Sequence, residues 1–182
     1  MSMPGWYDIH SFTSLHLAQK TNDTPRMLAS RSTLHRLIAD ERAKGIPAAR
    51  IVLGGFSQGG AMALLAGLTY EERLAGVFCL SGYLVMRDGF LGLLEEAQGK
   101  EGLDSVKTGG GAPVFMGHGD LDPTVKCEWG GLTRDVLQGW GWKVDWHMYP
   151  GLGHSVDPDE IDDVVDFLGK HIPERAAGEV KP

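Results

Sequence analysis

A pentapeptide, GFSQG at residues 55–59, narrows the possible folds of this chain more than any other segment. Apolar runs lie on both sides of it, at residues 51–53 and 61–65. An apolar run, a glycine-flanked serine and a second apolar run together predict a strand, a sharp turn and a helix. We therefore expect Ser57 at the tip of this turn as a nucleophile, with the backbone N–H of Gln58 beside it to stabilise an oxyanion.

A nucleophilic serine needs a general base, and in sites of this kind the base follows the serine and the acid along the chain. Four histidines follow the serine: His118, His147, His154 and His171. His154 lies in a glycine-rich loop after the strand-like run at 144–149, and a loop that follows a strand is a suitable place for a base. His147 falls within that run and is expected to be structural. His171 is expected to act as a helix C-terminal cap or charge partner. We therefore predict His154 as the base.

The candidate acids lie in the segment HGDLDP at residues 118–123, directly after a short apolar run that is expected to form a strand. We predict Asp122 as the orienting acid, because it lies in the loop after that strand and Pro123 is able to start the next helix. Asp120 is the competing acid, but a turn or capping role is the simpler interpretation of it. His118 is expected to brace this loop rather than to act as the base.

Several segments together resemble a known family. They are MPGWYDI at 3–9, GIPAARI at 45–51, GGFSQGGA at 54–61, HGDLDP at 118–123 and GHS at 153–155. In this order they are similar to the acyl-protein thioesterase/lysophospholipase branch of the α/β-hydrolases, over about residues 3–173. The resemblance implies an α/β-hydrolase fold, with Ser57 as nucleophile, Asp122 as orienting acid and His154 as general base.

The resemblance also implies an activity. It points to a serine esterase that hydrolyses long-chain acyl thioesters of proteins, including palmitoyl groups, without a cofactor. S-acylated proteins or acyl-ester lipids are then the expected substrates, and a carboxylesterase or lysophospholipase of small esters is the alternative. Trp6 is expected to contact substrate through the family segment that contains it. Leu84, with the apolar residues that follow it, is a candidate wall for the acyl chain, although core or lid packing is the simpler interpretation.

In the resembled family, a sizeable N-terminal portion precedes the segment at residues 3–9. It carries strands of the central sheet and a His-Gly loop that supplies a second oxyanion N–H. We expect this chain to lack that portion, so that Gln58 is the only predicted oxyanion donor and the strand at 50–53 is left at a sheet edge. A noncatalytic fragment is therefore a further alternative.

The rest of the chain alternates between helix-like and strand-like patterns, which predicts a mostly parallel sheet with helices on both faces. Strands are expected at 50–53, 76–80, 113–116 and 144–149, in one domain that covers residues 1–173, followed by a disordered tail at 174–182. Thr24 is expected to cap a helix that buries Met27, Leu34, Leu37 and Ile38. A last helix, starting near Asp157, is expected to bury Ile161, Val164, Val165 and Leu168.

Composition excludes several classes of protein. The formal net charge is −7, which argues against nucleic-acid binding. The two cysteines form no disulfide framework, and Cys79, in an apolar run, is expected to be a buried free thiol. We expect a cytoplasmic location, with the nucleus as a second one, because no signal-peptide core and no run long enough to span a membrane is present. The sequence also lacks the paired spacings typical of metal sites.

Overall fold

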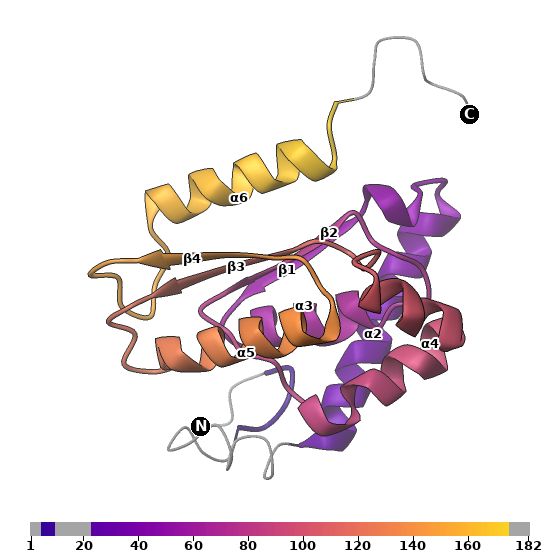
Figure 1. The fold of residues 1–182 in the computed structure, drawn as a ribbon, viewed down its shortest axis with the longest axis horizontal. Helices are drawn as coiled ribbons and strands as arrows, with labels where there is room; N and C mark the ends of the chain where they lie inside the picture. The colour runs from indigo at the N-terminus through magenta and orange to yellow at the C-terminus, as the bar shows by residue number, and fades with distance from the viewer. Residues whose placement is uncertain (1–4, 10–22, 175–182) are drawn as a thin grey trace.

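The computed structural model describes residues 5–9 and 23–174, and its centre is a four-stranded parallel sheet (Figure 1). The strands are β1 (Val52–Phe56), β2 (Gly76–Leu80), β3 (Val114–Gly119) and β4 (Val144–Tyr149), in the spatial order β1-β2-β3-β4. Every neighbouring pair is parallel, so the chain returns through a helical crossover between successive strands. Within the described residues, β1 pairs with β2 alone and forms an edge of the sheet, as expected.

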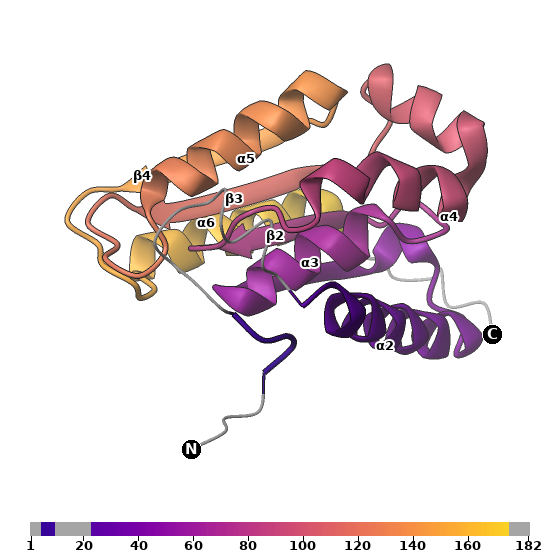
Figure 2. The same cartoon turned by 90° about the horizontal axis from the view of Figure 1, so that it is seen from below.

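Helices cover both faces of this sheet, as the alternating pattern predicts. The helices are α2 (Thr24–Ala43), α3 (Gln58–Leu68), α4 (Arg87–Lys107, interrupted at Gly99), α5 (Cys127–Trp140) and α6 (Pro158–His171), with a short 3-10 turn, η1 (Ala48–Arg50). In Figure 1, α6 covers one face while α3 and α5 cover the other. Figure 2 shows α3 between α5 and α2. The α/β class of the fold is therefore confirmed.

The main core lies between the sheet and the α3–α5 layer. Helix α3 is buried almost all round, from Gly60 to Leu68, which explains its lack of a polar face. Cys79 of β2 is also buried here, and both cysteines are free, as expected. Burial raises the pKa of the Cys79 thiol to about 12. None of the described helices has the length and apolarity needed to cross a bilayer.

Several predicted boundaries differ from the structure. Strand β1 begins at Val52 rather than at residue 50, because η1 occupies the preceding residues and ends in a backbone hydrogen bond from Ile51 to Ala48. Strand β3 extends to Gly119, past the predicted end at residue 116, since its pairing with β4 continues that far. Pro123 does not start the next helix, because α5 begins only at Cys127.

Helix α2 begins one residue earlier than predicted. Its N-cap is Asp23 rather than Thr24, and the Asp23 carboxylate accepts a hydrogen bond from the Arg26 N–H at 3.3 Å. Pro25 occupies the first turn, as expected. Of the apolar residues assigned to the inner face, Met27, Leu34 and Ile38 are buried, whereas Leu37 is exposed.

Helix α6 is rotated relative to the prediction. Its start after the Asp157 cap is confirmed, but Ile161 and Val165 are exposed, Leu168 is half-buried, and the buried residues are Glu160, Val164 and Phe167. The Phe167 ring occupies the space above Gly76, where a Cβ atom would lie 2.7 Å from it. An aromatic ring buries more apolar surface than Ile161 or Val165, so the fit of this ring sets the rotation of the helix.

Glu160 is the least expected member of the buried face. Its side chain is fully buried beneath Gly117 of β3, and neither carboxyl oxygen has a well-formed hydrogen bond to the described residues. Burial raises the pKa of this carboxyl from 4.5 to about 7, while the backbone N–H of Asp157 opposes the shift. This carboxyl group is therefore neutral below pH 7 and carries a poorly compensated charge above it.

We expect Glu160→Gln to stabilise the protein at alkaline pH. The folded state binds the Glu160 proton more tightly than the unfolded state, so stability is lost as pH rises from about 4.5 to 7. A shift of this size corresponds to about 3 kcal/mol. Denaturant unfolding at pH 5 and pH 8 measures the difference. The variant should lose less stability between the two pH values than wild type, and exposed Asp159→Asn is the control. Equal losses in wild type and Glu160→Gln would contradict the assignment.

Candidate active site

Ser57 lies at the sharp turn between β1 and α3, as the pentapeptide predicts. Its backbone angles are φ 54° and ψ −120°, a region that residues with side chains seldom adopt. Two backbone hydrogen bonds hold it there: the Ser57 N–H donates to the Leu80 carbonyl at 2.7 Å, and the Ser57 carbonyl accepts from the Ala61 N–H at 3.0 Å. The strained turn is therefore fixed to both β2 and α3.

The glycines of the pentapeptide are required by close packing of the backbone. A Cβ atom on Gly55 would lie 2.5 Å from the carbonyl carbon of Gly59, because β1 and the first turn of α3 meet at this point. No side chain fits at such a distance. The turn thus brings the hydroxyl of Ser57 to the carboxyl end of the sheet, where ligands bind in open α/β sheets.

The three residues predicted as nucleophile, base and acid lie in one hydrogen-bonded chain. The Ser57 hydroxyl is 3.0 Å from Nε2 of His154, and Nδ1 of His154 is 2.7 Å from Oδ2 of Asp122. With Asp122 ionised, Nδ1 carries the proton and Nε2 is left as the acceptor for the serine hydroxyl. The imidazole ring also lies against the ring of Phe56, with centroids 4.8 Å apart.

The Asp122 carboxylate is fixed by its own loop. Its Oδ1 accepts hydrogen bonds from the backbone N–H groups of Thr124 and Val125, at 2.8 and 2.9 Å. This leaves Oδ2 directed at His154. The side chain is almost entirely buried, so its contact with the imidazole is shielded from water.

His118 braces this loop, as predicted, and is not placed as the base. Its Nε2–H donates to the Val125 carbonyl at 2.8 Å, and the ring is fully buried at the end of β3. Burial lowers the pKa of this imidazole below its ordinary value, although the bond to Val125 and the charge of Asp122 oppose the shift. A neutral His118, 3.5 Å from the carboxylate, therefore adds no full charge beside Asp122.

The loops that carry Asp122 and His154 are tied to each other. Oδ1 of Asp120 accepts the Gly151 N–H at 2.6 Å, and the Leu121 N–H donates to the Leu152 carbonyl at 3.0 Å. Asp120 is thus a turn residue, as the simpler interpretation held. The other two histidines lie elsewhere: His147 of β4 contacts Asp145 and Asp163, and His171 ends α6 beside the ring of Phe167.

Comparison with known proteins gives the family. Residues 1–172 match the family described as Phospholipase/Carboxylesterase. This chain belongs to the phospholipase/carboxylesterase family. Acyl-protein thioesterase 1 of Neurospora crassa is 43% identical over 178 residues, which cover 97% of this chain and 69% of the relative. Acyl-protein thioesterase 1 of Gibberella zeae is 41% identical over 174 residues, which cover 95% and 70%.

Solved structures agree with this fold. The crystal structure of esterase PE8 is similar with a TM-score of 0.72 and 27% identity, and the match covers 91% of this chain and 69% of that one. The structure of Zea mays acyl-protein thioesterase 2 has a TM-score of 0.75 at 24% identity, covering 92% and 72%. The α/β-hydrolase architecture expected from the sequence is thereby confirmed for this family member.

In this member of the family, the predicted oxyanion donor lies at the start of a helix. Gln58 is the first residue of α3, directly after Ser57, and the first N–H groups of a helix have no acceptor within it. The helix dipole adds a partial positive charge at this point. The side chain of Gln58 turns away to residues 6 and 7, an arrangement that the sequence analysis missed because no local pattern encodes so distant a contact.

A shallow, open hollow lies over Ser57. It is lined by Gly5, Trp6, Phe56, Ser57, Gln58 and Gly59. The residues Trp6 and Phe56 are 39% and 37% exposed, which gives the hollow two apolar surfaces. Leu84 does not line this hollow: it is 2% exposed, in the main core, and its N–H donates to the Thr133 hydroxyl at 2.8 Å. Its role at an acyl chain stays a prediction. Among the described residues, no His, Cys, Asp and Glu cluster is suited to a metal ion.

Proposed function

We propose that this chain is a serine hydrolase that removes acyl groups from S-acylated proteins. The observation that carries the proposal is the hydrogen-bonded chain from Ser57 through His154 to Asp122, in a member of the phospholipase/carboxylesterase family. Relatives at 41–43% identity over nearly the whole chain are named acyl-protein thioesterase 1, which favours thioesters as substrates. The free cysteines suit a reducing compartment, and we propose the cytoplasm, with the nucleus, as its location.

The reaction proceeds in two acyl-transfer steps. Nε2 of His154 takes the proton of the Ser57 hydroxyl as its oxygen attacks the carbonyl carbon of the thioester. The Gln58 N–H donates to the resulting oxyanion, and Asp122 stabilises the imidazolium through Nδ1. The C–S bond then breaks, and His154 returns the proton to the departing thiolate, which leaves an ester on Ser57.

Water completes the cycle. His154 takes a proton from water as the water oxygen attacks the Ser57 ester, and it gives that proton back to the serine oxygen as the carboxylic acid leaves. A thioester suits this site because a cysteine thiol, with a pKa of about 8.5, leaves more readily than an alcohol. The apolar surfaces of Trp6 and Phe56 beside Ser57 are suited to the acyl chain.

A second candidate is hydrolysis of small carboxylic esters or lysophospholipids. The family description, Phospholipase/Carboxylesterase, and the shallow form of the hollow favour it. The chemistry at Ser57 is the same, so only the preferred acyl and leaving groups separate the two candidates.

The test is turnover of matched acyl substrates after covalent labelling. Purified protein is treated with a fluorophosphonate probe, and mass spectrometry should place the label on Ser57. Hydrolysis of palmitoyl-cysteine peptides should stop in proportion to the labelling. Higher kcat/KM for acetyl oxygen esters than for palmitoyl thioesters would favour the second candidate. A cooperative unfolding transition without labelling or turnover would contradict both and support a noncatalytic protein.

A further inference from the structure

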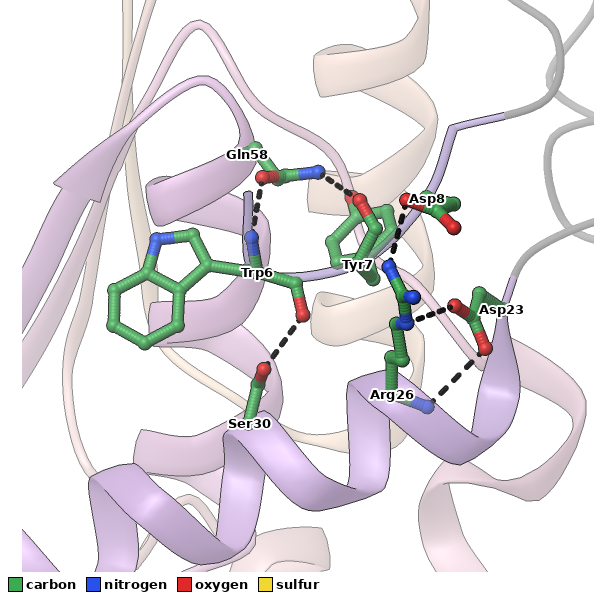
Figure 3. A network of polar contacts seen from close by, with 7 residues as sticks. All are labelled: Trp6, Tyr7, Asp8, Asp23, Arg26, Ser30 and Gln58. Atoms are coloured by element: carbon green, nitrogen blue, oxygen red, sulfur yellow. Dashed lines mark hydrogen bonds and ion pairs between the residues drawn. The ribbon is translucent and has the colours of Figure 1, made fainter. Parts of the chain in front are cut away.

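The side chain of Gln58 joins the nucleophile turn to a segment that is distant in sequence. We call residues 5–9 the strap. Oε1 of Gln58 accepts the N–H of Trp6 at 2.9 Å, and its Nε2 donates to the carbonyl of Tyr7 at 2.7 Å (Figure 3). The amide thus uses its acceptor and one donor on the backbone of two consecutive residues, Trp6 and Tyr7. This pairing fixes both the distance and the direction of the strap relative to Ser57.

Other contacts hold the strap from the side of α2. The carbonyl of Trp6 accepts the Ser30 hydroxyl at 2.6 Å, and the Asp8 carboxylate pairs with Arg26 at 3.0 Å (Figure 3). The side chain of Tyr7 is buried in the main core. The backbone of Trp6 is therefore held on two sides, by Gln58 through its N–H and by Ser30 through its carbonyl.

The indole of Trp6 is the part of the strap that remains accessible. It lies beside the first turn of α3, where a Cβ atom on Gly59 would be 3.9 Å from its Nε1 atom. Together with Phe56 it forms the apolar lining of the hollow over Ser57. An exposed aromatic ring with a fixed backbone is a preformed apolar surface, because little conformational entropy is lost when a ligand covers it.

We propose that the Gln58 side chain is a positioning residue that holds Trp6 as the surface on which the acyl chain lies. Gln58 then serves the site twice: its backbone N–H faces the oxyanion, and its amide sets the place of the apolar wall. We call the two hydrogen bonds from Gln58 to the strap the bracket. Selectivity for acyl length follows from the bracket, since long chains reach the indole and short ones do not. The inference rests on the proposed hydrolysis at Ser57.

The test compares Gln58→Met, Trp6→Ala and the double variant. Methionine keeps the length of the side chain and the backbone N–H but removes both hydrogen bonds to the strap. Thioesters with one leaving group and acyl chains of 2, 8 and 16 carbons are the probes. Each single variant should lose about tenfold in kcat/KM for the longest chain, mainly through KM, and the loss should become smaller as the acyl chain shortens. The double variant should lose no more than Trp6→Ala alone, because Gln58 acts through Trp6.

A matched control is available in Gln98. Its Nε2 donates to the carbonyl of Tyr70 at 2.6 Å, the same kind of bond, away from the residues that line the hollow. Gln98→Met should leave the acyl-length profile unchanged. The proposal is overturned if Gln58→Met lowers turnover equally at all acyl lengths, if its effect multiplies with that of Trp6→Ala, or if Gln98→Met changes the profile in the same way.

Hydrogen exchange separates this proposal from the proposed function. The N–H of Trp6 should exchange at least about tenfold faster in Gln58→Met than in wild type, and no faster in Gln98→Met. If wild type does not hydrolyse thioesters but the Trp6 N–H exchanges faster in Gln58→Met, then the bracket exists and the proposed function fails. Unchanged exchange would overturn the bracket even if the protein hydrolyses thioesters.

Discussion

Replacing Ser57 with Ala is expected to lower kcat for thioester hydrolysis by about a millionfold. The residual rate then comes from substrate binding and the oxyanion donor. The hydroxyl is the only group of the turn that attacks the carbonyl in the proposed mechanism, and alanine leaves the rest of the site in place. Alanine also accepts the positive φ of residue 57 no worse than serine, so the fold should persist. Steady-state kinetics with a palmitoyl thioester and thermal unfolding of the same samples measure both effects.

His154→Ala should cost as much as Ser57→Ala, and the double variant should be no slower than either. This follows because the serine and the imidazole act as one unit, joined by a 3.0 Å hydrogen bond. His147→Ala, on β4 and away from that unit, is the control and should retain activity. Losses that multiply in the double variant, or a His147→Ala variant as slow as His154→Ala, would disprove the assignment.

Asp122→Asn is expected to lower kcat by about 10⁴-fold while leaving the loop folded. The Oδ1 atom of residue 122 accepts two backbone N–H groups, so an asparagine oxygen should take that place and direct its NH₂ group at His154. The imidazole must then present Nδ1 as an acceptor and carry its proton on Nε2, where it is unable to accept the Ser57 proton. Kinetics with a short, water-soluble thioester measure the loss without interference from acyl-chain binding.

Asp120→Asn is the matched control for this change. Asp120 lies in the same loop, and its Oδ1 accepts the Gly151 N–H, a bond that an asparagine oxygen also forms. Its kcat should therefore stay within about threefold of wild type. A comparable loss in both variants would mean that the loop, rather than the tautomer of His154, is sensitive to the charge. Full activity in Asp122→Asn would exclude this residue as the orienting acid.

The site could be predicted from the sequence because local patterns indicate its catalytic residues. A strained strand–turn–helix needs glycines at fixed spacing, so GFSQG locates both a fold feature and Ser57. The carboxyl ends of parallel strands meet at one edge of the sheet, so residues in loops after β3 and β4 are expected near each other, as Asp122 and His154 are. The bonds from Gln58 to the strap span 51 and 52 residues, and no local pattern encodes them.

The predictions from sequence were wrong where long-range packing decides between two locally suitable residues. The spacing of Ile161 and Val165 fits an amphipathic helix, yet the ring of Phe167 over Gly76 rotates α6 and leaves both exposed. Likewise Asp23 and Thr24 are both good caps, and the hydrogen bond to Arg26 selects Asp23. The extent of the domain and of its tail stays a prediction, since residues 175–182 lie outside the described part of the chain.

The bonds between the loops of Asp122 and His154 have a consequence for motion at the site. Because Asp120 binds Gly151 and Leu121 binds Leu152, the two loops are joined directly to each other, whereas Ser57 belongs to the β1–α3 turn. We expect a shift of the turn relative to the loops to change the distance from Ser57 to the imidazole more than the distance from the imidazole to Asp122. Substitutions that shift the β1–α3 turn are therefore expected to weaken the contact between serine and histidine while the acid and the base stay paired.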